Sequence, residues 1–232
     1  MLPWVYCDPL SEGGLLSVTE AHHALKVLRL RYGDEVIAFN GSGVTRLGTL
    51  AENSKSARVN FTAPAEVASE MEDKLALVQC LPNDVSTFEL LLKKSCELGV
   101  QAIYPVIGDR TAGKLWTADL WAKKQTRWCQ ILIDACKQSK NPYFPHLHSI
   151  CDSLKHFDWH SFDLCLYGSL RHEPKPFIKK GHSMACVIGP EGGFSEEEET
   201  FLSTLAIPVR LSPYVLRVET AVVSAVTYGR FH

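Results

Sequence analysis

The sequence predicts an α/β protein in two parts, a small β-rich domain over residues 1–68 and a larger domain over residues 73–232 with a mainly parallel sheet. Short strand-like segments around the turn "NGSG" fill the first part. A polar, alanine-rich stretch, "APAEVASEMEDK", then leads into the second part. There, apolar strand-like runs alternate with helical patterns, which is typical of a parallel sheet covered by helices.

Composition limits the kinds of protein that this chain can be. Its 232 residues are 46% hydrophobic and 22% charged, enough apolar surface for a real core. No apolar run approaches the roughly 20 residues of a membrane helix, and the start "MLPWVYCDPL" does not resemble a secretory signal. We therefore expect a cytoplasmic protein without membrane segments. The net charge of −2 means that any nucleic-acid site must be a local basic patch.

The eight cysteines are expected to be buried free thiols rather than disulfides or metal ligands. Cys80, Cys165 and Cys186 lie in apolar strand-like runs, and the helical patterns contain three more, Cys96, Cys129 and Cys136. No pair has the CxxC spacing, and the "HLH" at 146–148 has no cysteine pattern beside it, so no metal site is expected.

The N-terminal part is expected to contain a hairpin and one helix. The segments "DEVIAFNGSGVTRLGTL" and "SARVNFTA" have the composition of strands. The helix "TEAHHALKVLRL" is expected to begin at a Thr19 cap and to end before "YGD". His22, Lys26 and Arg29 are spaced i, i+4, i+7 and would share one face of it. This face is either a phosphate-binding patch or simply a solvated surface.

In the C-terminal part, periodicity and capping signals define the elements in order. Ser86 and Glu89 have capping-box spacing, and Gly99 marks the end of that helix. The expected strands are 75–81, 102–107, 163–167, 184–189 and "PVRL", and the expected helices are 86–99, 119–139, one from Ser195 and one from about Glu219.

The stretch "VIGPEGGFSEEEE" is the first candidate site. Its glycine turn follows strand 184–189, and ligands of α/β sheets gather beyond the carboxyl ends of strands. Gly192 and Gly193 permit positive φ and a close approach of the backbone to a ligand. Ser195 and Glu198 form a capping box. A tight turn with a well-capped helix and no ligand is the alternative interpretation.

The four glutamates after the turn restrict the ligand. A glycine loop before a helix often binds phosphate, but this carboxylate cluster would repel it. The P-loop and G-x-G-x-x-G patterns are also missing. A ligand with little anionic character, such as an adenosine, remains compatible with the turn.

The stretch "LSPYVLRVETAVVSAV" is the second candidate site. Arg217 and Glu219 stand among apolar neighbours just after a strand, and charged residues are rarely buried unless they are paired. They are either site residues or a structural ion pair. The helix that follows is apolar on nearly every side, so it needs cover from its own core or from a partner subunit.

Four motifs together resemble one known family: "HHALKVLRLRYGDEV" with "FNGSG", "KKSCELGVQAIYPV", "VIGPEGGFSEEE" and "VLRVETA". Over essentially its whole length the chain is similar to the bacterial enzymes that methylate N3 of a uridine in 16S ribosomal RNA, a branch of the SPOUT methyltransferases. The resemblance implies a PUA-like RNA-binding barrel at the N-terminus. It also implies a C-terminal α/β domain with a deep trefoil knot that binds S-adenosylmethionine.

The resemblance further implies a homodimer whose substrate is U1498 of 16S rRNA, within the small ribosomal subunit, and no metal. RNA contacts would come from His22, Lys26, Arg29 and Arg31. The cofactor-binding residues implied are Leu166, Gly168, Gly189, Glu191, Gly192, Gly193, Leu211, Ser212, Val215, Leu216 and Arg217.

For the catalytic step, uridine N3 must lose its proton before it can attack the methyl group. The hypothesis is that Arg217 stabilises negative charge on the uracil oxygens, while Glu191 or Glu219 orients the base or takes the proton. A structural ion pair remains the competing role for Glu219.

The chain departs from the family pattern at four positions, Asp134, Asn141, Ser212 and Tyr214. These departures concern the RNA contacts and the backbone angles of the cofactor loop. They leave two alternatives open. One is an RNA-binding or ribosome-assembly factor that keeps the fold without the chemistry, and the other is a SPOUT methyltransferase with another RNA target.

Overall fold

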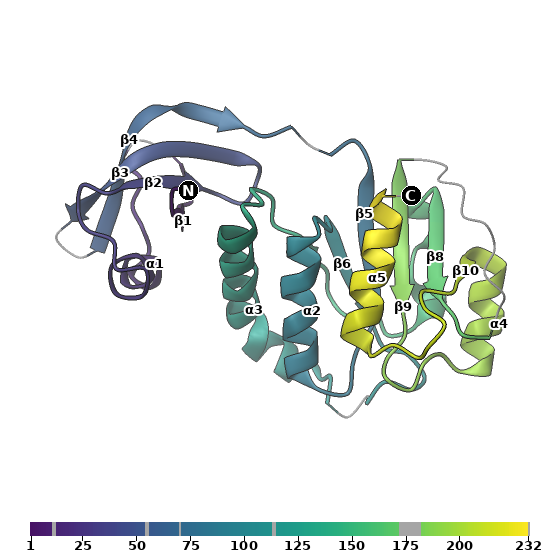
Figure 1. The fold of residues 1–232 in the computed structure, drawn as a ribbon. Coiled ribbons are helices and arrows are strands. Elements are labelled where there is room, and N and C mark those ends of the chain that lie inside the picture. Colours follow the sequence, from purple (N-terminus) through teal and green to yellow (C-terminus); the bar gives the residue numbers. More distant parts are fainter. Residues whose placement is uncertain (11–12, 54–55, 70, 113–114, 172–181, 232) are drawn as a thin grey trace. The chain divides into compact units, whose positions relative to one another are not determined.

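The computed structural model describes residues 1–10, 13–53, 56–69, 71–112, 115–171 and 182–231 (Figure 1). It divides into two compact units. The first consists of Met1–Glu70 and Ile133–Phe144, and the second consists of Met71–Leu132 and Pro145–His232.

The first unit is a four-stranded sheet with the order β1-β2-β3-β4. Strand β1 runs parallel to β2, and the other neighbours are antiparallel. Gly41 and Gly43, with φ of 82° and 87°, allow the tight β2–β3 connection, which confirms the predicted hairpin. The strands are β1 (Trp4–Tyr6), β2 (Glu35–Phe39), β3 (Val44–Asn53) and β4 (Ser56–Val67).

The segment after helix α3 belongs to this unit because it pairs with the hairpin. The Gly43 N–H donates to the Pro142 carbonyl at 2.9 Å, and the Tyr143 hydroxyl donates to the Ala68 carbonyl at 2.6 Å. Lys137, in the last turns of α3, forms a buried ion pair with Glu20 at 2.9 Å. Helix residues far along the chain thus complete the core of the N-terminal unit.

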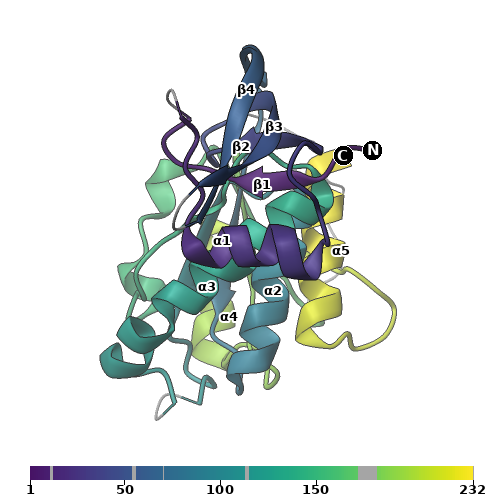
Figure 2. The same cartoon turned by 90° about the vertical axis from the view of Figure 1, so that its left-hand side faces the viewer.

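The helix of the first unit differs from the prediction at both ends. Helix α1 (Val18–His22) begins at Ser17, whose side chain accepts the Glu20 N–H, so the predicted Thr19 cap is wrong. It continues as the π-helical η1 (His23–Val27), and Arg29 then adopts a left-handed φ of 56°. Figure 2 shows α1 beside the sheet, where it contacts β4.

The second unit is a six-stranded sheet with the order β10-β8-β9-β5-β6-β7, and all its pairings are parallel, as predicted. The strands are β5 (Lys74–Cys80), β6 (Ala102–Val106), β7 (His146–Leu147), β8 (Leu164–Gly168), β9 (Ser183–Ile188) and β10 (Ile207–Val209). The helices are α2 (Val85–Glu97), α3 (Ala118–Ser139), α4 (Glu196–Leu205) and α5 (Val218–Phe231), with short 3-10 turns η2 (Leu154–His156) and η3 (Trp159–Ser161).

One side of the apolar helix α5 is covered within the chain, while Ala221, Val223 and Ser224 stay half-buried. It packs on β5 and β9 with α2 beside it (Figure 1). Val222 and Val226 are fully buried there, and so are Leu77 and Val187 of the two central strands.

Two helix starts test the capping predictions. The box of Ser195 and Glu198 is present at α4, as predicted. At α2 the predicted box is wrong, because Asp84 is the cap and accepts the Thr87 N–H, while Glu89 forms an ion pair with Arg127 at 2.6 Å.

All eight cysteines are free thiols, and six of them are buried. Burial raises the pKa of the Cys186 thiol to about 12, which makes it unreactive. Cys129 is exposed on α3 and Cys151 is partly exposed, so the expectation of burial is wrong for these two. In the described ranges no helix is long and apolar enough to cross a membrane, and no cluster could hold a metal ion.

Candidate functional site

A cavity of about 690 Å³ opens at the carboxyl ends of β8, β9 and β10. This is the edge of a parallel sheet where ligands are expected. The three segments that follow these strands form its walls. Asp84 and Thr87 at the start of α2, Arg110 after β6 and Glu199 on α4 complete the lining. It holds both motifs that the sequence singled out, the glycine turn and the stretch around Arg217.

The glycine turn is tight because a hydrogen bond within its own backbone closes it. The Gly193 N–H donates to the Pro190 carbonyl at 2.8 Å, and Gly193 has a φ of 68°. A Cβ on Gly189 would lie 3.3 Å from the Gly193 backbone. Glycine at these two positions therefore keeps a bare backbone at the cavity wall.

A backbone N–H and a side chain from two neighbouring loops hold this turn in place. The Asn83 N–H, from the loop after β5, donates to the Glu191 carboxylate at 2.9 Å. Arg110, from the loop after β6, donates to the Gly192 carbonyl at 2.7 Å. The buried Glu198 carboxylate accepts the Asp109 N–H at 2.9 Å and ties the same loop to α4. The turn is thus fixed from outside as well as by its glycines.

The structure brings nearly all of the predicted catalytic and cofactor-binding residues to one cavity. The three predicted catalytic residues, Arg217, Glu191 and Glu219, line it. Leu166 does not, because its side chain is 3% exposed inside β8. The other predicted cofactor residues that line the cavity are Gly168, Gly189, Gly192, Gly193, Leu211, Ser212, Val215 and Leu216.

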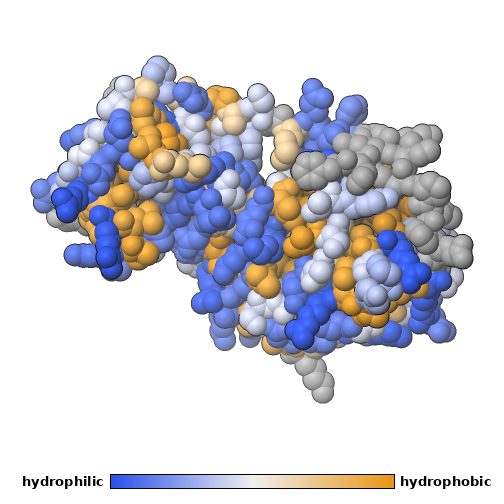
Figure 3. Space-filling view, viewed as in Figure 1, coloured by the Kyte–Doolittle hydropathy of each residue, from blue (hydrophilic) through white to orange (hydrophobic). Residues whose placement is uncertain are grey.

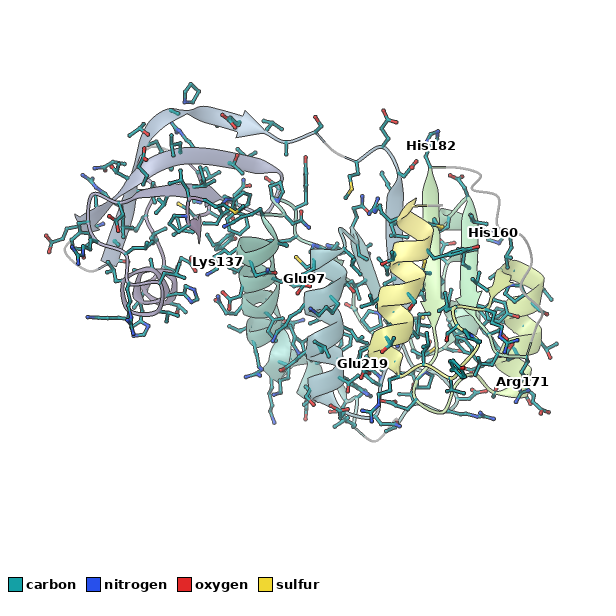
Figure 4. All side chains as sticks on the ribbon, in the orientation of Figure 1. Glu97, Lys137, His160, Arg171, His182 and Glu219 are labelled. Atoms are coloured by element: carbon teal, nitrogen blue, oxygen red, sulfur yellow. The ribbon has the colours of Figure 1, made fainter. Side chains whose placement is uncertain are left out.

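Arg217 and Glu219 are not the buried ion pair that the sequence left open. Arg217 is exposed and Glu219 is half-buried on the first turn of α5 (Figure 4). In the described ranges no salt bridge joins the two side chains. The apolar neighbours in the sequence face the core, while these two charged residues face the cavity.

Sequence reasoning missed several polar lining residues, namely Asp84, Thr87, Arg110, Ser169, Arg171 and Glu199. Ser169 and Arg171 follow β8, and Arg110 follows β6. The sequence has no glycine-rich turn at either place, so nothing there indicated a site. The sequence around Glu199 carries no local signal for the site, because the direction of this side chain depends on the packing of α4 against β10.

Glu199 forms a buried polar cluster at the cavity wall. The Ser169 hydroxyl donates to its two carboxylate oxygens at 3.2 and 3.1 Å. Tyr167 lies beside it. Burial raises the pKa of Tyr167 to about 12, and the charge and hydrogen bond of Glu199 contribute to the same shift. The Tyr167 phenol is therefore protonated at neutral pH.

The predicted RNA-binding residues lie in the first unit and do not form one helical face. His22, Lys26, Arg29 and Arg31 are all exposed, but the π-helical turns and the left-handed Arg29 break the expected i, i+4, i+7 row. Exposed apolar side chains accompany them, and Figure 3 shows orange and blue atoms intermixed over α1. These are Val18, Val27 and Leu28, with 73%, 60% and 41% exposure.

The departures from the family pattern have local partners. The Asn141 side chain accepts the Tyr143 N–H at 3.0 Å, and Asp134 pairs with Lys137 at 2.9 Å. The Ser212 hydroxyl accepts the Tyr214 N–H at 3.1 Å. Ser212 is not among the residues with positive φ, so replacing glycine there creates no left-handed strain.

Comparisons with known proteins identify the class of protein that this fold and cavity define. A family model described as an RNA methyltransferase domain matches residues 69–229, and a model of an RNA methyltransferase PUA domain matches residues 16–62. The chain is therefore an RNA methyltransferase with a PUA domain.

Individual relatives narrow this class. The ribosomal RNA small subunit methyltransferase E of Aquifex aeolicus is 32% identical over 70% of this chain and 72% of its own length. The Bacillus subtilis protein of the same name is 29% identical over 94% and 92%. This chain belongs to the family of ribosomal RNA small subunit methyltransferases E.

Solved structures agree with this assignment. A Legionella pneumophila methyltransferase, solved with the bound cofactor SAM, has a TM-score of 0.88 and 29% identity and covers 99% of this chain and 97% of its own. The ribosomal RNA small subunit methyltransferase E of Neisseria gonorrhoeae, bound to S-adenosyl methionine, has a TM-score of 0.81 and 26% identity, with 98% and 96% covered.

Proposed function

We propose that the protein transfers the methyl group of S-adenosylmethionine to N3 of a uridine, U1498, in 16S ribosomal RNA of the small subunit. The observation that carries the proposal is the single cavity that joins the glycine turn to Arg217 and Glu219. Membership of the family and the cofactor in two solved relatives support the cofactor assignment.

The cavity fits an adenosyl ligand better than a nucleotide with phosphates. Its bare backbone at Gly189 and Gly193 can contact the edge of a purine ring, and Leu211, Val215 and Leu216 supply apolar surface. The carboxylates of Glu191 and Glu199 on its walls would repel phosphates. When bound, S-adenosylmethionine supplies the electrophilic methyl group.

Arg217 and Glu219 are the residues that we assign to the uridine. Arg217 is exposed on the cavity wall, where its guanidinium can stabilise the charge that develops on a uracil oxygen. Glu219 lines the same wall on α5, and its carboxylate can accept the N3 proton. Glu191 already accepts the Asn83 N–H, so we assign it to holding the turn and orienting the base.

We also propose the arrangement of the whole protein. Residues 1–68 form a PUA-like barrel that holds RNA phosphates through His22, Lys26, Arg29 and Arg31, all of them exposed. Residues 73–232, apart from the segment 133–144 that joins the first unit, form the methyltransferase domain, threaded as a deep trefoil knot. The protein acts in the cytoplasm as a homodimer. The target base is unpaired or flipped out, because pairing hides N3.

One experiment tests the reaction and its target together. Nucleosides of 16S rRNA from a strain that lacks the gene are compared by mass spectrometry with those from the parent strain. Loss of 3-methyluridine at U1498, restored by the gene, is the expected result. Loss of another methylated nucleoside would show a different target. Unchanged rRNA methylation would favour a ribosome-assembly factor without methyltransferase activity. Isothermal titration would then show no binding of S-adenosylmethionine, whereas an enzyme would bind it.

A further inference from the structure

One of the four glutamates that open α4 has no role in the reaction described above. Glu198 closes the capping box, and Glu196 and Glu197 have side chains that are 84% and 83% exposed. Glu199 instead is 8% exposed and lines the cavity. A carboxylate that is taken out of water and placed on a cavity wall costs free energy, so its placement calls for a function.

The surroundings of Glu199 stabilise a negative charge there. The Ser169 hydroxyl donates hydrogen bonds to the carboxylate, and the neutral Tyr167 phenol lies beside it. The carboxylate also lies one turn from the N-terminus of α4, where the helix dipole favours an anion. The chain can therefore keep a carboxylate charge at this wall, and the low-dielectric surroundings extend its influence into the cavity.

We propose that Glu199 is a specificity-determining residue that makes the cavity bind the cationic methyl donor more tightly than the neutral product. The inference rests on the proposed function, because it takes the cavity to be the S-adenosylmethionine site. It adds a preference for the donor over the product, which neither the fold nor the methyl transfer itself requires.

The charge change of the reaction provides the physical reason. Transfer breaks the bond between sulfur and the methyl carbon, and its electron pair stays on sulfur while N3 forms the new bond to that carbon. The sulfonium cation thereby becomes a neutral thioether. The attraction of Glu199 for the ligand is lost at this step, so S-adenosylhomocysteine is released more easily and inhibits less.

Isothermal titration with three ligands tests this inference on the full chain. S-adenosylmethionine and sinefungin, whose protonatable amine replaces the methyl-bearing sulfonium, are cationic at the reacting position, while S-adenosylhomocysteine is not. In Glu199→Gln we expect both cationic ligands to lose roughly tenfold in affinity, because a close charge pair contributes about 1.4 kcal/mol or more. S-adenosylhomocysteine should stay within about twofold, since a neutral sulfur gains little from the carboxylate.

The matched control is Glu197→Gln. It removes the same charge from the same helix turn, but its side chain is 83% exposed. Solvent screens this charge, so the ratio of the affinities for donor and product should not change. Circular dichroism and thermal melting check that both variants are folded.

An equal loss of affinity for all three ligands in Glu199→Gln, or no loss, would overturn the inference. If that variant does not fold, the affinities of the wild-type chain for the three ligands still test the inference. It should bind sinefungin and S-adenosylmethionine more tightly than S-adenosylhomocysteine, and equal or tighter binding of the product overturns the inference. A wild-type chain that binds none of the three would instead overturn the proposed function itself.

Discussion

The two walls of the cavity are held in different ways. The glycine turn from Gly189 to Gly193 is fixed by Asn83 and Arg110, residues about 80 to 110 positions away in the chain. In the described part of the chain, the hydrogen bonds of the segment Leu211–Arg217 reach only sequence neighbours, such as Arg210 to the Ser212 carbonyl at 3.3 Å. The glycine turn is thus a fixed wall, held by loops that follow other strands of the sheet. The segment Leu211–Arg217 is a local loop, held only by its own neighbours.

Exposure follows the same division. Tyr214 and Val215 of the local loop are 78% and 79% exposed. Large apolar side chains exposed beside a cavity usually mark a surface that another molecule covers. We therefore expect the fixed wall to serve the cofactor alone, and the local loop to contact the substrate as well as the cofactor. Mutations in the two walls should therefore affect different steps.

The largest effect is expected from the local loop, in Arg217→Ala. Loss of its guanidinium should reduce the rate of methylation at saturating cofactor by roughly 100-fold or more, a typical consequence of removing a group that stabilises developing charge. Affinity for S-adenosylmethionine should change by only a few-fold. Single-turnover methylation of small subunits and calorimetry measure the two quantities. A rate within a few-fold of wild type would contradict the catalytic role.

The fixed wall should show the opposite pattern in Arg110→Ala. This change removes the hydrogen bond to the Gly192 carbonyl and loosens the turn. We expect the affinity for S-adenosylmethionine to fall roughly tenfold, as for loss of one hydrogen bond to a charged group. The rate at saturating cofactor should stay close to wild type.

The control for this pattern is Arg127→Ala. Arg127 pairs with Glu89 outside the cavity, and its side chain is 62% exposed. Its loss should leave the affinity for the cofactor unchanged. If Arg110→Ala mainly lowered the rate, the proposed division between the two walls would be wrong.

Local patterns in the sequence predicted the fixed wall well. The capping box of Ser195 and Glu198 and the positive φ of Gly193 depend on a few neighbouring residues, and both are present. The hydrogen bond between Arg110 and Gly192 joins positions 82 apart, so no periodicity in the sequence could indicate it. The inward direction of Glu199 also depended on the packing of α4 against β10.

Helix geometry explains the errors in the first unit. The prediction of one basic face assumed 3.6 residues per turn from His22 to Arg29. Five residues, His23–Val27, instead form a π-helix, which rotates every later side chain. At α2, the box of Ser86 and Glu89 had the correct spacing, but Asp84 two residues earlier is a competing cap. Spacing alone cannot decide between such neighbours.

The exposed basic residues Lys26 and Arg29 of the first unit are expected to affect RNA binding but not the cavity. In a double variant with Lys26→Ala and Arg29→Ala, RNA affinity should fall severalfold, and the slope of log affinity against log salt should decrease by up to about 2. Both side chains are exposed, so folding should be unaffected. Filter binding at several salt concentrations measures the slope. An unchanged slope would place the phosphate contacts elsewhere, while cofactor binding should stay normal in either case.

The smallest effect is expected at the cavity rim, in Asp84→Asn. Hydrogen bonds from Ser86 and Thr87 lower the pKa of the Asp84 carboxyl to about 2. Because its pKa is lower in the folded state, the carboxylate stabilises the fold above its unfolded pKa of about 4, and this contribution is lost as the pH falls toward 2. Asparagine is itself a good cap, so we expect a loss below about 1 kcal/mol at pH 7.

Urea unfolding of the wild type and Asp84→Asn at several pH values checks this contribution. The two stability curves should converge between pH 4 and pH 2, the window set by the Asp84 pKa that the hydrogen bonds of the cap lower. Asp84→Ala, which removes the cap acceptor altogether, should lose about 1 kcal/mol more, and that difference should persist at low pH. Curves that stay parallel for the asparagine variant would mean that the carboxylate charge contributes nothing, and that the cap acts through its hydrogen bond alone.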